Sequence, residues 1–167
     1  MSTIRIGDIC SYRSETVSAS VADQDSYVST ESMLPNRGGV RRASSFPSDG
    51  SVKRFRQGDT LVSNIRPYFK KIWRATKNGT CSNDVLVFEP TNCDSEFLYW
   101  ALSNEEFFDY AVATSKGTKM PRGDKSAIMD YSITPFTIEM QRSISRLLRP
   151  IQEKTNLNNR INDYLAA

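Results

Sequence analysis

The C-terminal stretch constrains the fold of this chain more than any other, because its apolar residues recur at a heptad spacing. With Ile144 at heptad position a, the a positions hold Ile144, Ile151, Asn158 and Leu165, and the d positions hold Leu147, Lys154 and Ile161. Leu148 and Leu157 widen this stripe. The pattern predicts a helix from Ile138 onward that is roughly 42 Å long at about 1.5 Å per residue. Pro150 is expected to kink that helix or to divide it in two.

The predicted stripe is longer than a small domain needs for covering its own core. Asn158 and Lys154 are poor residues for a dry core, but polar groups at such positions can select the register and the partner of a coiled coil. We therefore expect the helix to pair with a second helix, as a homodimer or with another chain. The alternative is an ordinary terminal helix that packs on its own domain.

Residues 1–136 combine short apolar runs of strand type with a helical segment, which predicts an α/β (α+β) domain followed by the helix at 137–167. The expected strands are Ile4–Ile9 (or an entry turn there), Tyr27–Thr30, Thr60–Ile65, Ile72–Ala75, Val85–Phe88 and Met129–Ile133. We expect one or two helices in residues 95–113, with Asp94 or Ser95 as the N-cap. Residues 13–25 and 31–52 are expected to be loops, and Asn78–Gly79 a tight turn.

Charge is segregated along the chain, although the net charge is only +3. Residues 37–77 carry 11 basic and two acidic side chains, whereas residues 78–115 carry seven acidic and no basic ones. A basic block interleaved with aromatic residues suits a polyanion such as nucleic acid, and the acidic block is then expected to face away from it. The alternative is a solvated face whose charge is partly cancelled by the acidic block.

The segment after the predicted strand Thr60–Ile65 is the first candidate region for DNA contacts. Its candidate residues are Arg66, Tyr68, Lys70 and Lys71. Pro67 stiffens the backbone that carries them. Arginine can fork onto guanine or phosphate, and lysine acts as a point charge toward phosphate. Alternatively, Tyr68 packs in the core and Arg66 pairs with a nearby acidic side chain.

Two loops carry the other candidate DNA contacts. The candidates are Lys116, Lys119 and Arg122 in one loop, and Arg37, Arg41 and Arg42 in the other. Gly117 and Gly123 would let the backbone of the first loop approach a duplex closely, although this loop could also be a simple connector. The second loop would form a flexible basic arm, or equally a stretch of solvated charge.

Several kinds of active site find no support in the residues present. The chain has no histidine, and its three cysteines are scattered without CxxC spacing, which argues for a reducing cytosol and against zinc or disulfides. No apolar run reaches the roughly 20 residues that span a bilayer, and we find no secretion signal.

Asp59 and Asp84 could pair around a metal, but no third ligand is placed beside them. We interpret both as structural turn and cap residues, and expect no metal site and a cytoplasmic location.

Four short motifs and the terminal segment occur in the order found in a known family. The motifs are Tyr27–Glu31 (YVSTE), Gly58–Tyr68 (GDTLVSNIRPY), Cys81–Asp84 (CSND) and Gly117–Arg122 (GTKMPR), followed by Gln141–Leu165. Together they resemble the target recognition domain and adjoining conserved helix of type I restriction–modification specificity subunits. The resemblance implies a curved mixed β-sheet with packed helices, followed by a long helix that pairs antiparallel with an equivalent helix. Full-length members carry two of each, so this chain resembles a half-length specificity subunit.

The resemblance also implies a role without chemistry of its own. A specificity subunit reads DNA half-sites and docks methyltransferase (modification) subunits and a restriction subunit, to which S-adenosylmethionine, ATP and magnesium would belong. Two copies joined through the terminal helix would make the DNA target symmetric and bipartite. The alternatives are an assembly or regulatory protein that pairs with full-length specificity subunits, and a stand-alone DNA-modifying enzyme that uses Asp59 and Asp84.

Overall fold

One strand with two buried faces organises the domain. Strand β6 (Thr60–Ser63) is buried along its whole length. Leu61 belongs to one hydrophobic cluster, and Val62 belongs to a second cluster that includes Leu98. Since successive side chains of a strand point to opposite faces, β6 separates two hydrophobic cores. The computed structural model describes residues 2–165.

Strand β6 lies inside a four-stranded antiparallel sheet with the order β2–β9–β6–β7. The other strands are β2 (Cys10–Tyr12), β9 (Val85–Pro90) and β7 (Ile72–Arg74). Leu61 is paired with Val87 of β9 on one side and with Trp73 of β7 on the other. The strands predicted at β6, β7 and β9 are confirmed, with ends that differ by one to two residues, whereas no strand was predicted at β2.

A second, mixed sheet has the order β3–β5–β8–β4. Its strands are β3 (Thr16–Ser18), β5 (Ser51–Phe55), β8 (Gly79–Cys81) and β4 (Tyr27–Val28), and only the β4–β8 pair is parallel. The prediction of uninterrupted loops at 13–25 and 31–52 is therefore wrong at β3 and β5. Strand β3 has only three residues and is stabilised by a distant partner, since Val17 pairs with Val52.

Gly79 opens strand β8, so the predicted tight turn at Asn78–Gly79 is wrong. A Cβ atom at Gly79 would lie 2.3 Å from the carbonyl oxygen of Ser26 and 2.5 Å from Cζ of Phe55. Both distances are far below van der Waals contact. The glycine is required here by the close packing of β8, and not by the geometry of a turn.

Three short α-helices, α1 (Ser95–Ser103), α2 (Glu105–Ala113) and α3 (Lys125–Met129), follow the sheets in the chain. The N-cap predicted at Asp94 is confirmed, because its carboxylate accepts a hydrogen bond of 3.0 Å from the backbone N–H of Phe97. Residues 2–165 also form three 3₁₀ turns: η1 (Ile6–Asp8), η2 (Ala19–Val21) and η3 (Pro67–Phe69).

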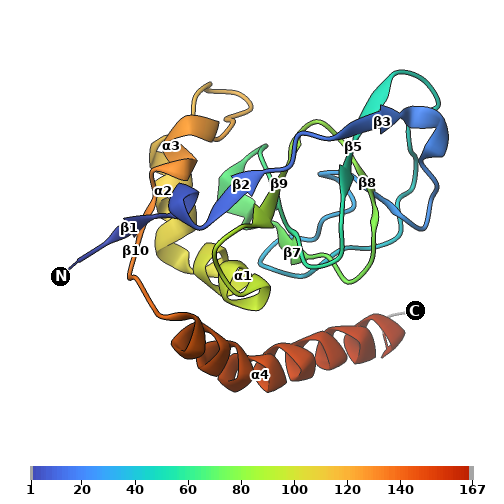
Figure 1. The fold of residues 1–167 in the computed structure, drawn as a ribbon. Coiled ribbons are helices and arrows are strands. Elements are labelled where there is room, and N and C mark those ends of the chain that lie inside the picture. The colour runs from blue at the N-terminus through green and yellow to red at the C-terminus, as the bar shows by residue number, and fades with distance from the viewer. Residues whose placement is uncertain (1, 166–167) are drawn as a thin grey trace.

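The strand predicted at Met129–Ile133 is wrong in its first half. Asp124 caps helix α3, which extends to Met129, and only Ser132–Ile133 form a strand, β10. Strand β10 pairs with β1 (Ile4–Arg5) in a separate two-stranded sheet. Figure 1 shows α2 and α3 at one end of the domain, the second sheet at the other end, and the first sheet between them.

The chain ends in α4 (Ile138–Leu165), which runs along one side of the domain (Figure 1). The helix is continuous through Pro150, so the prediction that proline divides it is wrong. Proline removes one N–H and leaves the carbonyl of Arg146 without its helical donor. Arg146 is exposed, so water can satisfy that carbonyl. The predicted α/β class with a mixed sheet and a long terminal helix is confirmed.

Helix α4 is attached to the domain mainly through its first half. Gln141 and Ser145 are buried, and Ile144 packs against the core that contains α1. The side chain of Gln141 accepts a hydrogen bond from the backbone N–H of Asp94 and donates one to the carbonyl of Phe136, each 2.9 Å long. These buried polar contacts fix the position of the helix start relative to α1.

Candidate nucleic-acid interface

Three loops that are far apart in the sequence meet on one surface, which we call the three-loop surface: residues 34–41, 64–71 and 116–123. The backbone N–H of Arg66 donates to the carbonyl of Pro121 over 2.8 Å. On the other side, the N–H of Asn36 donates to the carbonyl of Phe69 over 2.8 Å, and the N–H of Arg37 donates to Lys70 over 2.9 Å. Backbone hydrogen bonds therefore join all three loops, and each loop holds residues that were predicted to contact DNA.

The turn η3 stands at the centre of this surface. Arg66 and Lys70, which flank it, have φ angles of 50° and 51°, in the left-handed region that costs about 1 kcal/mol or more for residues with a Cβ. Pro67 is buried, but Tyr68 is 47% exposed and Phe69 is 38% exposed. The alternative placement of Tyr68 in the core is therefore wrong, and both rings face outward from a stiff turn.

Some of the predicted contact residues are engaged by an acidic side chain. Glu105, at the start of α2, pairs with Lys70 and with Arg37, the latter over 2.9 Å. Arg37 also donates to the carbonyl of Ser103 and lies 5.5 Å from the centre of the Phe108 ring. The hydrogen bonds from Lys70 and then from Arg37 hold the pKa of Glu105 below its ordinary value.

Three other cations of this surface, Lys71, Lys116 and Arg122, also have partners within the chain. Lys71 donates to the carbonyl of Thr30 over 2.7 Å and lies 5.7 Å from the centre of the Phe69 ring. Partial burial lowers the pKa of Lys71, and the positive charge of Arg41 lowers it further. Two pairs complete the set: Arg122 with Asp84 at 3.2 Å, and Lys116 with Asp124 at 2.5 Å.

The remaining predicted residues divide into two groups. Arg41, Arg66 and Lys119 are exposed and form no ion pair with any side chain that the structure describes. Arg42 lies outside the three loops and pairs with Asp25 over 2.7 Å. The expectation that the acidic block faces away from this surface is wrong at Glu105 and at Asp84, which contact its basic residues. A local charge count could not reveal these contacts, because each joins residues more than 30 positions apart.

The two aspartates of the enzyme alternative have separate structural roles. Asp59 is buried and accepts hydrogen bonds of 2.7 and 3.0 Å from the guanidinium of Arg13 and one of 2.8 Å from the backbone N–H of Arg56. Asp84 pairs with Arg122. Among residues 2–165, no three His, Cys, Asp or Glu side chains converge as metal ligands would.

The outward face of α4 exposes most of the predicted heptad residues. Leu147 is 73% exposed, Ile151 60%, Ile161 47% and Leu165 79%. Leu157 and Asn158 are exposed as well, whereas Ile144 and Leu148 are half-buried. We call the exposed positions Leu147, Ile151, Ile161 and Leu165 the outer stripe of α4.

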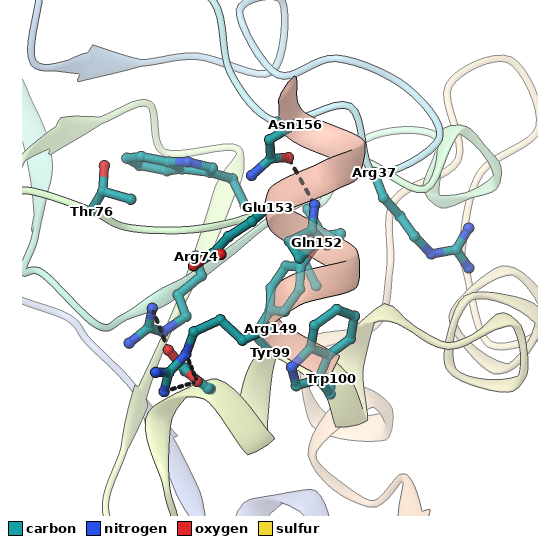
Figure 2. A pocket seen from close by; sticks show the side chains of 13 residues that line it. Arg37, Arg74, Thr76, Tyr99, Trp100, Arg149, Gln152, Glu153 and Asn156 are labelled. Atoms are coloured by element: carbon teal, nitrogen blue, oxygen red, sulfur yellow. Dashed lines mark hydrogen bonds and ion pairs between the residues drawn. The ribbon is translucent and has the colours of Figure 1, made fainter. Parts of the chain in front are cut away.

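A cleft of about 260 Å³ separates the middle of α4 from the domain (Figure 2). Glu96 of α1 lines this cleft. Its carboxylate accepts a hydrogen bond of 2.8 Å from Arg149 of α4 and lies 3.6 Å from the guanidinium of Arg74 of β7. The hydroxyl of Tyr99 donates to Gln152 over 3.1 Å. These contacts hold the middle of the helix at the edge of the cleft and complete its attachment to α1.

The fold of this chain is similar to the folds of solved subunits from type I restriction–modification systems. The crystal structure of the HsdS subunit from Thermoanaerobacter tengcongensis has a TM-score of 0.69 and 20% identity, over 98% of this chain and 45% of that one. A chain from a study of complex assembly and conformational transition of the type I R-M system scores 0.72 at 18% identity, with coverages of 98% and 45%. The S subunit from M. genitalium scores 0.63 at 19% identity, with coverages of 91% and 39%.

The sequence itself is similar to one particular specificity subunit. It is 28% identical over 114 residues to the type I restriction enzyme EcoDI specificity subunit of Escherichia coli. The aligned region covers 67% of this chain and 25% of that relative. No family model matches the chain. The predicted resemblance is confirmed, and the chain spans a quarter of that relative and less than half of the solved subunits.

In the described part of the chain, no helix has both the length and the hydropathy required to cross a bilayer.

Proposed function

We propose that this chain is a DNA-reading unit of a type I restriction–modification system and that the three-loop surface contacts one half-site. The observation that carries the proposal is the convergence of three separate loops on one exposed, basic and aromatic surface, within a specificity-subunit fold. Arg41, Arg66 and Lys119 are the exposed cations available for phosphate or base contacts. Backbone hydrogen bonds between the loops keep the surface ordered before DNA binds, which lowers the entropic cost of recognition.

The outer stripe of α4 would supply the second half of the recognition unit by pairing with another copy of the helix. Four large apolar side chains at heptad spacing face solvent, and such a face is normally covered by a partner. A two-fold pair would present two three-loop surfaces, so the DNA target would consist of two half-sites related by symmetry.

In this proposal the chain is a non-catalytic scaffold. It would dock methyltransferase subunits and a restriction subunit, and these partners would hold S-adenosylmethionine, ATP and magnesium. Asp59 and Asp84 support this role better than an active site, because each is engaged by an arginine. Methyl transfer or cleavage of DNA by the purified chain, given magnesium or S-adenosylmethionine, would contradict it.

Selection of bound duplexes from a random DNA pool, with and without the methyltransferase subunit, tests the proposal. We expect enrichment of two short sequence blocks with a fixed gap, related by symmetry if the chain pairs with itself. An asymmetric site would instead indicate a second, different recognition chain as the partner.

A second function is favoured by the outer stripe alone. A chain that uses α4 to pair with full-length specificity subunits would act as an assembly or regulatory protein. It would bind such subunits tightly and would enrich no sequence from the pool under either condition. The selection experiment therefore separates the two functions, because only the first requires sequence preference by this chain.

A further inference from the structure

The aromatic pair Tyr68–Phe69 differs from most other aromatic side chains of the molecule. The rings of Phe55, Phe88 and Phe107 are fully buried, whereas Tyr68 and Phe69 are 47% and 38% exposed on adjacent positions. The two ring centres lie 4.8 Å apart with an angle of 53° between the ring planes. Adjacent exposed rings in mutual contact form a projecting apolar surface within an otherwise polar region.

The pair is mounted on a turn that is held from three sides. Arg66 is tied to Pro121 and Phe69 is tied to Asn36 by the backbone hydrogen bonds described above. Pro67 fixes its own φ and is buried beneath the turn. The positive φ angles of Arg66 and Lys70 are maintained by this framework. The rings therefore cannot retract easily when a partner approaches.

The surroundings of the pair favour an anionic partner with flat faces. Lys71 lies against the Phe69 ring, and Arg41 is close enough to lower the pKa of Lys71. Arg66 immediately precedes the turn and is exposed. Aromatic faces stack on bases, and apolar wedges flanked by cations partly unstack base pairs when a protein bends DNA. A protein partner that buried this pair would also have to desolvate or neutralise three cations.

We propose that η3 is an aromatic wedge in which Tyr68, braced by Phe69, stacks into a base-pair step of DNA bound at the three-loop surface. This inference rests on the proposed function, since it requires DNA to lie on that surface. Insertion would open the stack at one step, which is easiest at flexible pyrimidine–purine steps. Part of the sequence preference would then come from DNA deformability, at a position where the protein forms no hydrogen bond to a base.

The test uses the selected duplex with 2-aminopurine placed at each step of a half-site in turn. Binding of the unaltered protein is expected to raise 2-aminopurine fluorescence at one step, because unstacking relieves its quenching. Tyr68→Ala should abolish that rise and weaken binding by about tenfold, since loss of stacking on one base has an effect of this order. Tyr68→Phe should retain the rise, because it keeps the ring.

Phe46→Ala is the matched control, since Phe46 is 43% exposed and lies outside the three loops. It should change neither fluorescence nor affinity. Binding without a fluorescence rise at any step would overturn the wedge while leaving DNA recognition intact. Unchanged affinity of Tyr68→Ala for DNA together with lost binding of methyltransferase would also overturn it, and would assign the pair to a protein contact. Absence of any sequence-selective DNA binding by the unaltered protein would instead contradict the proposed function itself.

Discussion

The three-loop surface and the outer stripe of α4 both expose side chains that proteins usually bury or neutralise, but they do so in opposite ways. On the three-loop surface, the chain itself engages several charges, as when Glu105 pairs with Lys70 and Arg37. On α4, the residues that the structure describes leave Leu147, Ile151 and Leu165 mostly exposed. The charge of the three-loop surface is therefore partly neutralised, whereas the apolar side chains of the outer stripe recur at a regular spacing and are exposed.

This difference separates what each region requires from a partner. A polyanion can bind the three-loop surface through a few exposed cations, and it can compete with Glu105 for Lys70 and Arg37. The affinity of this surface for a polyanion should therefore fall as the salt concentration rises. The outer stripe of α4 has only apolar area to offer, so its binding should depend on burial and tolerate salt.

Ile151→Asp should eliminate pairing through α4. Ile151 lies in the middle of the outer stripe and is 60% exposed, so the substitution leaves the fold of the free chain intact. A carboxylate buried without a partner in the paired state costs several kcal/mol, which raises the dissociation constant by at least about 100-fold. Sedimentation velocity at micromolar concentration should show a dimer for the unaltered chain and a monomer for the variant.

Val112→Asp is the control for this change, because Val112 is an exposed apolar residue of a different helix, α2. It should leave the dimer unaffected. A dimer that persists in Ile151→Asp would contradict the assignment of the outer stripe as the pairing surface, even if the protein binds DNA normally.

Gln141→Ala should destabilise the joint between α4 and the domain. The substitution removes both hydrogen bonds of a buried side chain and leaves Asp94 N–H and Phe136 C=O without these partners. The expected loss in the free energy of unfolding is about 1–3 kcal/mol, measured by urea denaturation at one protein concentration. Gln57→Ala, at an exposed glutamine, should have almost no effect. An unchanged stability for Gln141→Ala would show that the start of α4 is held by apolar packing alone.

The double substitution Arg66→Gln with Lys119→Gln should weaken DNA binding several-fold and reduce its dependence on salt. Both cations are exposed and unpaired among the described residues, so each can reach a phosphate without breaking an internal contact. If each neutralises one phosphate, the log–log slope of affinity against salt should fall by about 0.9 per contact. Arg42→Gln is the control, since Arg42 pairs with Asp25 outside this surface. Equal slopes for the double variant and the unaltered protein would exclude both residues from phosphate contact.

The sequence predicted the elements whose pattern is complete within a short window. Strand β6 and the helical segment 95–113 were identified correctly, because an apolar run or a helical repeat is visible locally. Strand β3 was missed since only its pairing with β5 stabilises it. Gly79 was interpreted as a turn residue because sequence alone cannot show the approach of Ser26 and Phe55.

The candidate site was predictable as a set of charged segments but not as an arrangement. The motifs located the loops, yet nothing local indicated that residues 34–41 hydrogen-bond to the turn after β6, or that Glu105 would lie against Lys70. Which basic side chains remain unpaired depends on tertiary contacts, and so it could not be read from composition.

Glu105→Gln should produce the smallest effect and should act in the opposite direction, by strengthening DNA binding. The substitution keeps the size of the side chain and releases both Lys70 and Arg37 from their ionised partner. Affinity should rise modestly, and the salt dependence should become steeper as the released cations reach phosphates. Glu106→Gln is a closely matched control, since Glu106 is the exposed neighbour on α2 and its loss changes the net charge equally.

The contact of Glu105 with Lys70 and Arg37 also determines how the effect of Glu105→Gln should depend on pH. Because the pKa of Glu105 is lowered by Lys70 and Arg37, its contribution to folding is present above the pKa of the unfolded chain and is lost only as pH falls through the lower folded value. Between about pH 5 and pH 8 Glu105 therefore stays ionised. The ratio of the DNA affinity of Glu105→Gln to that of the unaltered protein should then be constant over this range. An equal gain in Glu106→Gln would show that overall charge rather than release of Lys70 and Arg37 controls binding. A ratio that changes across this range would contradict the lowered pKa of Glu105, because Glu105 would then titrate within it. A constant ratio with gain confined to Glu105→Gln would identify the carboxylate as an internal competitor of DNA phosphate.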